Sequence, residues 1–166
     1  MKYITLLLAT ALCTVNAFAQ APNIEWQKTL GGTTTDYAYS IQQTTDGGYV
    51  VAGQTSSNDG DVSGNHGGYD IWVAKLNSTG ATMWRKIFGG VGNDGAYSIQ
   101  QTVDGGYIIA GITYSNDGDV SGNHGQTDAW VVKLNSLGAI VWQKTLGGTD
   151  RDHASNIQQT DRKSVV

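Results

Sequence analysis

Residue types that carry common kinds of protein chemistry are scarce in this chain of 166 residues. Its only cysteine is Cys13, so an internal disulfide and a cysteine-based metal site are excluded. Its only glutamate is Glu25, which argues against sugar hydrolysis by paired carboxylates. The formal net charge is −4 and charged residues make up only 14%, so no basic surface is available to bind nucleic acid.

The first nineteen residues have the pattern of an export signal. Lys2 supplies the positive start, Ile4 to Val15 form a short apolar stretch, and Ala17-Phe18-Ala19 is a cleavage pattern before Gln20. The apolar stretch is too short to span a bilayer, so the mature chain is expected to have no transmembrane segment. We therefore expect residues 1–19 to be a signal peptide and the protein to be secreted or on the outer cell surface. A genuine N-terminal helix is the alternative.

What the chain has in abundance is glycine, with 23 residues, and an internal repeat. The heptapeptide beginning at Trp26 returns at Trp84 and again at Trp142, with a spacing of 58 residues both times (84 − 26 and 142 − 84). Residues 26–83 and 84–141 agree at 39 of 58 positions without a gap. A period of this length indicates a supersecondary unit that buries its apolar surface only against its neighbours.

Each repeat predicts four strands separated by turn residues. The glycines of Asp46-Gly47-Gly48 permit a tight turn, and Tyr49 to Thr55 is an almost continuous apolar run. The predicted strands are 38–44, 49–55, 70–77 and 81–88, and in the next copy 96–102, 107–113, 128–135 and 139–146. Because consecutive antiparallel strands form a meander, and meanders repeated radially form a β-propeller, the fold class is all-β. A β-solenoid and two unrelated sandwiches are the alternatives.

The predicted organisation of residues 20–160 is a partial propeller of about two and a half blades. It comprises a lone strand at 24–30, blades at 37–88 and 95–146, and the start of a further blade at 153–160. In such a meander, the loops after the second and fourth strands leave the sheet on the same side. The acidic loops 56–69 and 114–127 should therefore share one rim with the Gly-Gly loops 31–37 and 89–95.

The repeat resembles a known bacterial family. Asp70-Ile71-Trp72-Val73-Ala74-Lys75-Leu76-Asn77, followed by Gly80, Trp84, Gly89-Gly90, Asp94 and Ala96, is similar to the SBBP-type β-propeller repeat. It is also similar to repeats of secreted Bacteroidetes proteins that carry a type IX secretion sorting domain, which is absent here. The resemblance covers residues 24–160 and implies a secreted or cell-surface propeller, usually without an assigned activity.

The end of the chain departs from the repeat. After Thr160 the sequence reads Asp161-Arg162-Lys163-Ser164-Val165-Val166, where the earlier copies continue into an Asp-Gly-Gly-Tyr turn. This hexapeptide corresponds to the translation of a common sequencing adapter. We therefore expect residues 161–166 not to be native sequence and the complete gene to encode further blades. A natural, divergent C-terminus is the alternative.

The two acidic loops are candidate calcium sites. Oxygen-bearing residues stand at positions 1, 3, 5, 7 and 12 of each loop with glycine at position 6, which are the offsets of an EF-hand loop. The alternative is a polar hairpin loop in which aspartates cap turns. The candidate Ca²⁺ ligands are Asp59, Asp61, Ser63, Asn65 (by its carbonyl) and Asp70 in the first loop, and Asp117, Asp119, Ser121, Asn123 (by its carbonyl) and Asp128 in the second.

The sequence contains no recognisable catalytic signature. His66 and His124 occupy the same repeat position, which favours a structural role over a catalytic one. The tryptophans recur within apolar runs, so we expect them to pack blade against blade, although stacking on sugar rings is the alternative. The sequence thus favours a binding or scaffold module for an extracellular glycan or protein. The alternative is the non-catalytic portion of a secreted hydrolase or lyase whose active site lies elsewhere.

Overall fold

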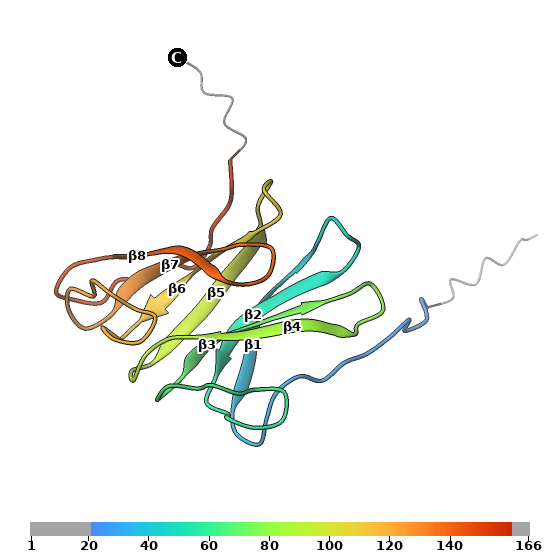
Figure 1. The fold of residues 1–166 in the computed structure, drawn as a ribbon, viewed down its shortest axis with the longest axis horizontal. Coiled ribbons are helices and arrows are strands. Elements are labelled where there is room, and N and C mark those ends of the chain that lie inside the picture. The colour runs from blue at the N-terminus through green and yellow to red at the C-terminus, as the bar shows by residue number, and fades with distance from the viewer. Residues whose placement is uncertain (1–20, 161–166) are drawn as a thin grey trace, which may run out of the picture.

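The computed structural model describes residues 21–160; the predicted signal peptide (1–19) and the predicted non-native tail (161–166) lie outside this range. These residues form two four-stranded sheets (Figure 1). The strands of the first sheet are β1 (Asp36–Gln43), β2 (Tyr49–Thr55), β3 (Asp70–Leu76) and β4 (Thr82–Phe88). Those of the second are β5 (Asp94–Gln101), β6 (Tyr107–Thr113), β7 (Asp128–Leu134) and β8 (Ile140–Leu146).

Both sheets are antiparallel meanders in which each strand pairs with the next one in the chain. The prediction of an all-β chain with four antiparallel strands per repeat is confirmed. The described part of the chain contains no helix with the length and hydropathy needed to cross a membrane.

Turn chemistry fixes the strand register in both repeats. Gly47 and Gly105 have φ values of 78° in the turns after β1 and β5, a conformation that glycine adopts without a steric penalty. The Asp46 carboxylate accepts hydrogen bonds from the Thr44 hydroxyl (2.5 Å) and the Gly48 N–H (3.0 Å), which closes the first of these turns. The repeated Thr-x-Asp-Gly-Gly sequence is thus a β-hairpin signal that the structure uses twice.

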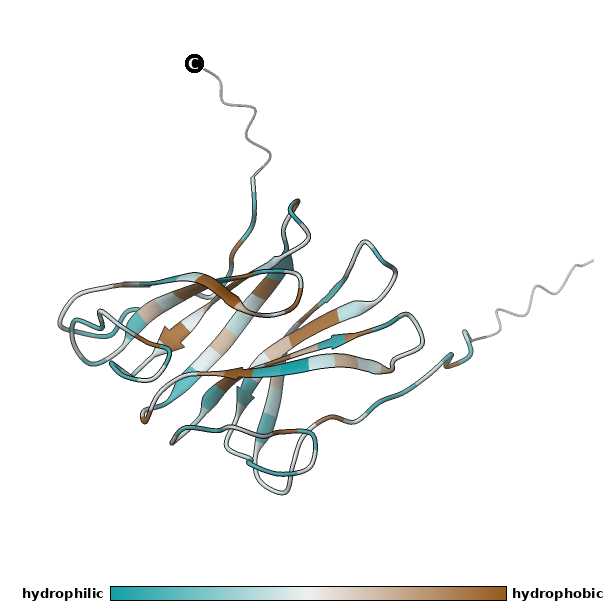
Figure 2. Ribbon diagram, in the orientation of Figure 1, coloured by the Kyte–Doolittle hydropathy of each residue, from teal (hydrophilic) through white to brown (hydrophobic). Residues whose placement is uncertain are grey.

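The main apolar core lies between the two sheets. One face of the first sheet meets one face of the second, so that apolar side chains along the strands of both sheets are buried in one layer (Figure 2). The β3 strand is buried along its whole length. The buried side chains of this core are Val50, Ala52, Ile71, Val73, Phe88, Ala96, Ile99, Tyr107, Ile109, Val120, Trp130, Val132 and Leu134.

Glutamine side chains join the first strands of successive repeats. The Gln101 N–H donates to Gln42 Oε1 (2.5 Å), and Gln101 Oε1 in turn accepts from the Thr45 N–H (2.8 Å). The same two bonds recur one repeat later, from the Gln159 N–H to Gln100 Oε1 (2.5 Å) and from the Val103 N–H to Gln159 Oε1 (2.9 Å). The repeats are therefore related by one common packing arrangement.

The segments at the two ends of the described range differ from their predicted form. Residues 24–30 and 153–160 were expected to be strands, and the structure assigns no strand to either, although the Ala154 N–H donates a hydrogen bond to the Gly111 carbonyl of β6 (3.3 Å). Their packing nevertheless follows the repeat. The Trp26 ring lies 5.4 Å from that of Tyr49, as Trp84 lies 5.6 Å from Tyr107.

Candidate functional site

The acidic loops and the Gly-Gly loops meet at one rim of the sheets. The Asp59 carboxylate accepts hydrogen bonds from the Thr33 N–H and hydroxyl (both 2.7 Å). These two bonds hold its pKa below the usual value. In the second repeat, Asp117 accepts from the Val91 N–H (2.9 Å). The prediction that both loop sets share a rim is confirmed.

An aspartate at the same repeat position anchors each Gly-Gly loop at this rim, and the one in the second repeat, Asp94, is buried. Asp94 accepts from the Gly90 N–H (2.9 Å), from the Ser115 hydroxyl (2.7 Å) and from the Thr113 hydroxyl. Asp36 makes the same three kinds of bond in the first repeat, and Asp152 accepts from the Gly148 N–H (2.8 Å) in the third. The recurring aspartate is therefore a turn-capping group.

A histidine–aspartate pair recurs in the acidic loops. Asp70 is fully buried, and its Oδ2 accepts hydrogen bonds from the His66 N–H (2.7 Å) and Nδ1 (2.9 Å). Burial raises the pKa of the Asp70 carboxyl. Its other oxygen, Oδ1, has no hydrogen-bond partner among residues 21–160. Asp128 and His124 repeat the pair at 3.1 and 2.7 Å.

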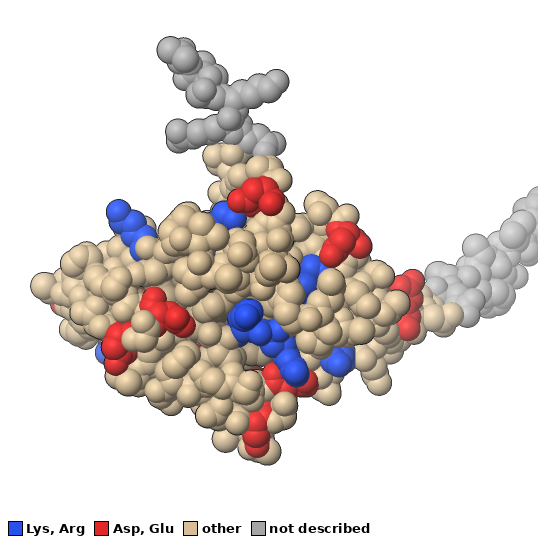
Figure 3. Space-filling view, in the orientation of Figure 1, with Lys and Arg blue, Asp and Glu red and all other residues tan. Residues whose placement is uncertain are grey.

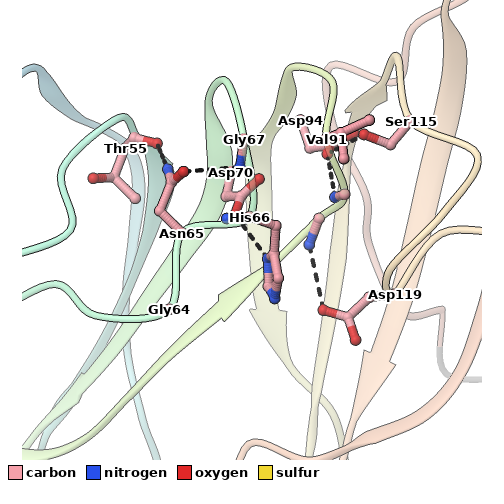
Figure 4. A network of polar contacts seen from close by, with 12 residues as sticks. Thr55, Gly64, Asn65, His66, Gly67, Asp70, Val91, Asp94, Ser115 and Asp119 are labelled. Atoms are coloured by element: carbon pink, nitrogen blue, oxygen red, sulfur yellow. Dashed lines mark hydrogen bonds and ion pairs between the residues drawn. The ribbon is translucent and has the colours of Figure 1, made fainter.

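The other predicted calcium ligands are directed to separate partners. Asp61 pairs with Arg85 of β4, and Asp119 accepts from the Gly89 N–H (3.4 Å) (Figure 4). Ser63 lines the groove between the sheets, while Ser121 Oγ accepts from the Gln143 side chain (2.5 Å). The Asn65 amide donates to the carbonyls of Thr55 and Gly68 (both 3.1 Å), and Asn123 likewise donates to the Thr113 carbonyl (3.3 Å).

These contacts do not bring the loop carboxylates together around one point. Within residues 21–160, no three side chains of His, Cys, Asp or Glu are grouped closely enough to hold a metal ion. In this arrangement the acidic loops are organised by hydrogen bonds to the Gly-Gly loops, to histidine and to arginine. Calcium binding by these loops stays a prediction, and its measurement is given below.

A groove of about 860 Å³ runs between the outer parts of the two sheets. It is bounded by β4, by both acidic loops and by the turn between β7 and β8, and Asp61, His66, Lys86 and Asp119 line it. Lys and Arg side chains gather near the middle of this face, over β4 (Figure 3). Cationic and anionic groups therefore face one another across the groove.

Two of the tryptophans that could have stacked on sugars are used for packing. A Cβ atom added to Gly138 would lie 3.0 Å from the Trp84 ring, and one added to Gly80 would lie 2.6 Å from the Trp26 ring. The packing role that the sequence predicted is confirmed for these two. By contrast, Trp142 on β8 is 47% exposed.

A row of tyrosines forms the aromatic feature that sequence reasoning missed. The ring centroids of Tyr37 and Tyr39 lie 5.7 Å apart, those of Tyr37 and Tyr69 lie 6.4 Å apart, and those of Tyr39 and Tyr97 lie 5.5 Å apart. Burial raises the pKa of Tyr39 and of Tyr97, and Tyr114 lies close enough to Tyr97 to raise the pKa of its hydroxyl further. The available signal was the recurrence of Tyr39 at Tyr97, at one position of the first strands, whereas Tyr37 and Tyr69 do not recur in the next copy.

No protein-family model and no curated protein matches this chain. We therefore infer the function from the geometry of the rim and of the loops.

Proposed function

We propose that this chain is part of a secreted or cell-surface β-propeller that acts as a binding or scaffold module. The two four-stranded meanders serve as consecutive blades, with β1 and β5 nearest the propeller axis. The glutamine bonds between first strands support this arrangement, because they recur one repeat apart and so can extend from blade to blade.

One observation favours binding over catalysis: the histidine–aspartate pairs and the capping aspartates at the rim are the same in both repeats. Each histidine–aspartate pair and each capping aspartate has its counterpart 58 residues away with the same partners. A catalytic centre requires one distinctive arrangement, whereas a scaffold requires the same loop in each blade. The resemblance to SBBP-type repeats and to type IX-secreted proteins agrees with this proposal.

The test is to offer the exported protein immobilised neutral and acidic polysaccharides and to measure both binding and the release of reducing ends. The proposal expects binding without release. Release of reducing ends would favour the alternative, in which the chain belongs to a secreted hydrolase or lyase. His66→Gln and His124→Gln are a matched pair for that case, because loss of activity in only one of them would identify a catalytic histidine. Retention of the protein inside the cell would contradict the proposed location.

A further inference from the structure

The internal repeat provides a way to separate structural residues from ligand-contacting ones. Residues that build the blade should be the same in each copy, while residues that contact a ligand are free to differ. A pocket of about 580 Å³ lies at the end of the tyrosine row, where residues 151–155 approach the second sheet. Its size is within the range of small-molecule sites.

The residues that line this pocket are mostly those at which the copies differ. Six of its nine lining residues stand where the preceding repeat has another residue. These six lining residues are Ile112, Tyr114, Thr127, Arg151, His153 and Ser155. The residues 58 positions earlier are, in the same order, Gln54, Ser56, Tyr69, Asn93, Gly95 and Tyr97. By contrast, 39 of 58 positions agree between residues 26–83 and 84–141. Departures from the repeat are therefore more frequent among the residues that line this pocket than along the repeat as a whole.

At two of these positions, Thr127 and Ser155, a smaller residue lines the hollow where the preceding repeat has a tyrosine. In the first two copies, Tyr39 and Tyr97 are the extra residues of β-bulges, since the register shifts between Ala38 and Ser40 and between Ala96 and Ser98. A bulge redirects a side chain away from the sheet face, and here it sets the two rings 5.5 Å apart. The third copy has Ser155 at this position, so the row ends and the space of a third ring is left open.

The chemistry of the pocket identifies the kind of ligand. Tyr39, Tyr97 and Ile112 present apolar surface, and Tyr114 is 43% exposed beside them. Ser155, His153 and Arg151 also line the pocket and bring hydroxyl, imidazole and guanidinium groups, the last of which donates from Nε to Gln126 Oε1 (3.3 Å). Arg151 and Asp152 have opposite charges, so a charged ligand gains little from the pocket as a whole. Apolar ring faces with hydrogen-bonding edges complement a neutral sugar ring, which has C–H faces and hydroxyl edges.

We propose that this pocket binds a neutral saccharide, with a sugar ring in the place of the missing third tyrosine. This rests on the proposed function and names its ligand class. Tyr97 provides the stacking surface, and Arg151 and His153 provide hydrogen bonds to ring hydroxyls. The affinity expected for one or two stacked rings is weak, with a Kd of roughly 0.1–1 mM.

The test is isothermal titration calorimetry of the exported protein with neutral pentasaccharides of glucose, mannose and xylose, and with oligogalacturonate as the acidic comparison. Ser155→Tyr should fill the pocket and weaken binding of the best neutral ligand about tenfold or more. Ser155→Ala leaves the pocket open and should bind as the unaltered protein does. Circular dichroism checks that each variant is folded, and Tyr114→Ala replaces Ser155→Tyr if that variant does not fold.

Each outcome bears on the proposal. Neutral binding that is lost in Ser155→Tyr and kept in Ser155→Ala supports it. If Ser155→Tyr and Tyr114→Ala both bind the neutral pentasaccharide as the unaltered protein does, the proposed site is wrong but the proposed binding function is not. The same holds if the protein binds oligogalacturonate alone. Binding of none of these ligands overturns the saccharide proposal, and binding of no polysaccharide in the earlier assay overturns the proposed function as well.

Discussion

Replacement of Gly138 by alanine tests the packing between the two sheets. Gly138 lies in the turn between β7 and β8 with φ of 77°, and an added Cβ would lie 3.0 Å from the Trp84 ring and 3.1 Å from Lys86 Cγ. Gly105 supplies a matched control: its φ is 78°, and nothing lies within 4 Å of an added Cβ. The two variants therefore share the same backbone strain and differ in contact with the neighbouring sheet.

The expected loss in the free energy of unfolding has two contributions, backbone strain and crowding against Trp84. The left-handed backbone costs an alanine about 1 kcal/mol at either position. Crowding against Trp84 should add about 1–2 kcal/mol at Gly138 only, because a close contact with a packed ring forces a local shift. Urea denaturation of both variants and the unaltered protein measures the difference. Equal losses at the two glycines would contradict the inter-sheet contact.

A double variant makes the same test independent of backbone strain. Trp84→Leu removes the ring that the new methyl group meets, so Gly138→Ala should cost less in that background by about 1 kcal/mol. Gly105→Ala should cost the same in both backgrounds, since nothing joins it to Trp84. Absence of coupling at Gly138 would show that Trp84 does not pack on this turn.

Three further predictions concern the rim, the opposite turns and calcium. Asp94→Ala should lower the free energy of unfolding by about 3 kcal/mol or more, because three buried donors lose their acceptor. Asp36→Ala should lower it by less, because Asp36 is more exposed. Urea denaturation measures both losses, and equal losses would contradict this prediction. A hydrogen bond from Lys75 lowers the folded-state pKa of Asp46. The contribution of the ionised Asp46 to the free energy of unfolding is therefore full above about pH 4 and is lost as the pH falls further. In an acid titration, the free energy of unfolding of Lys75→Met should fall by less than that of the unaltered protein over this pH range. If the acidic loops bind calcium, the melting temperature is higher in millimolar CaCl₂ than in EDTA and Asp59→Asn reduces the difference, whereas identical curves would contradict calcium binding.

The strands and turns were predictable from the sequence because their signals are local. The apolar run at Tyr49–Thr55 and the Asp-Gly-Gly turn before it specify a strand and its hairpin wherever they occur. The repeat added the information that such units pack on one another. The structure assigns no strand to the terminal segments 24–30 and 153–160, where ladder formation depends on a neighbouring strand as well as on the segment's own residues.

The side-chain contacts of the loops were less predictable. The spacing of Asp59, Asp61 and Asp70 indicates a common ion, but Thr33 and Arg85 lie more than twenty residues away in sequence and take two of these carboxylates as partners. The pocket was missed for a similar reason. Its walls come from five segments of the chain, and Tyr39 and Tyr97 reach it from β-bulges that no local motif predicts.

The saccharide site can be observed in a crystal structure of the protein soaked with the neutral pentasaccharide that binds best. We expect a sugar ring in the pocket between Tyr97 and Ser155, with hydroxyls within hydrogen-bond distance of Arg151 or His153. A sugar bound in the groove over β4, or on the exposed face of Trp142, with the tyrosine pocket empty would contradict it.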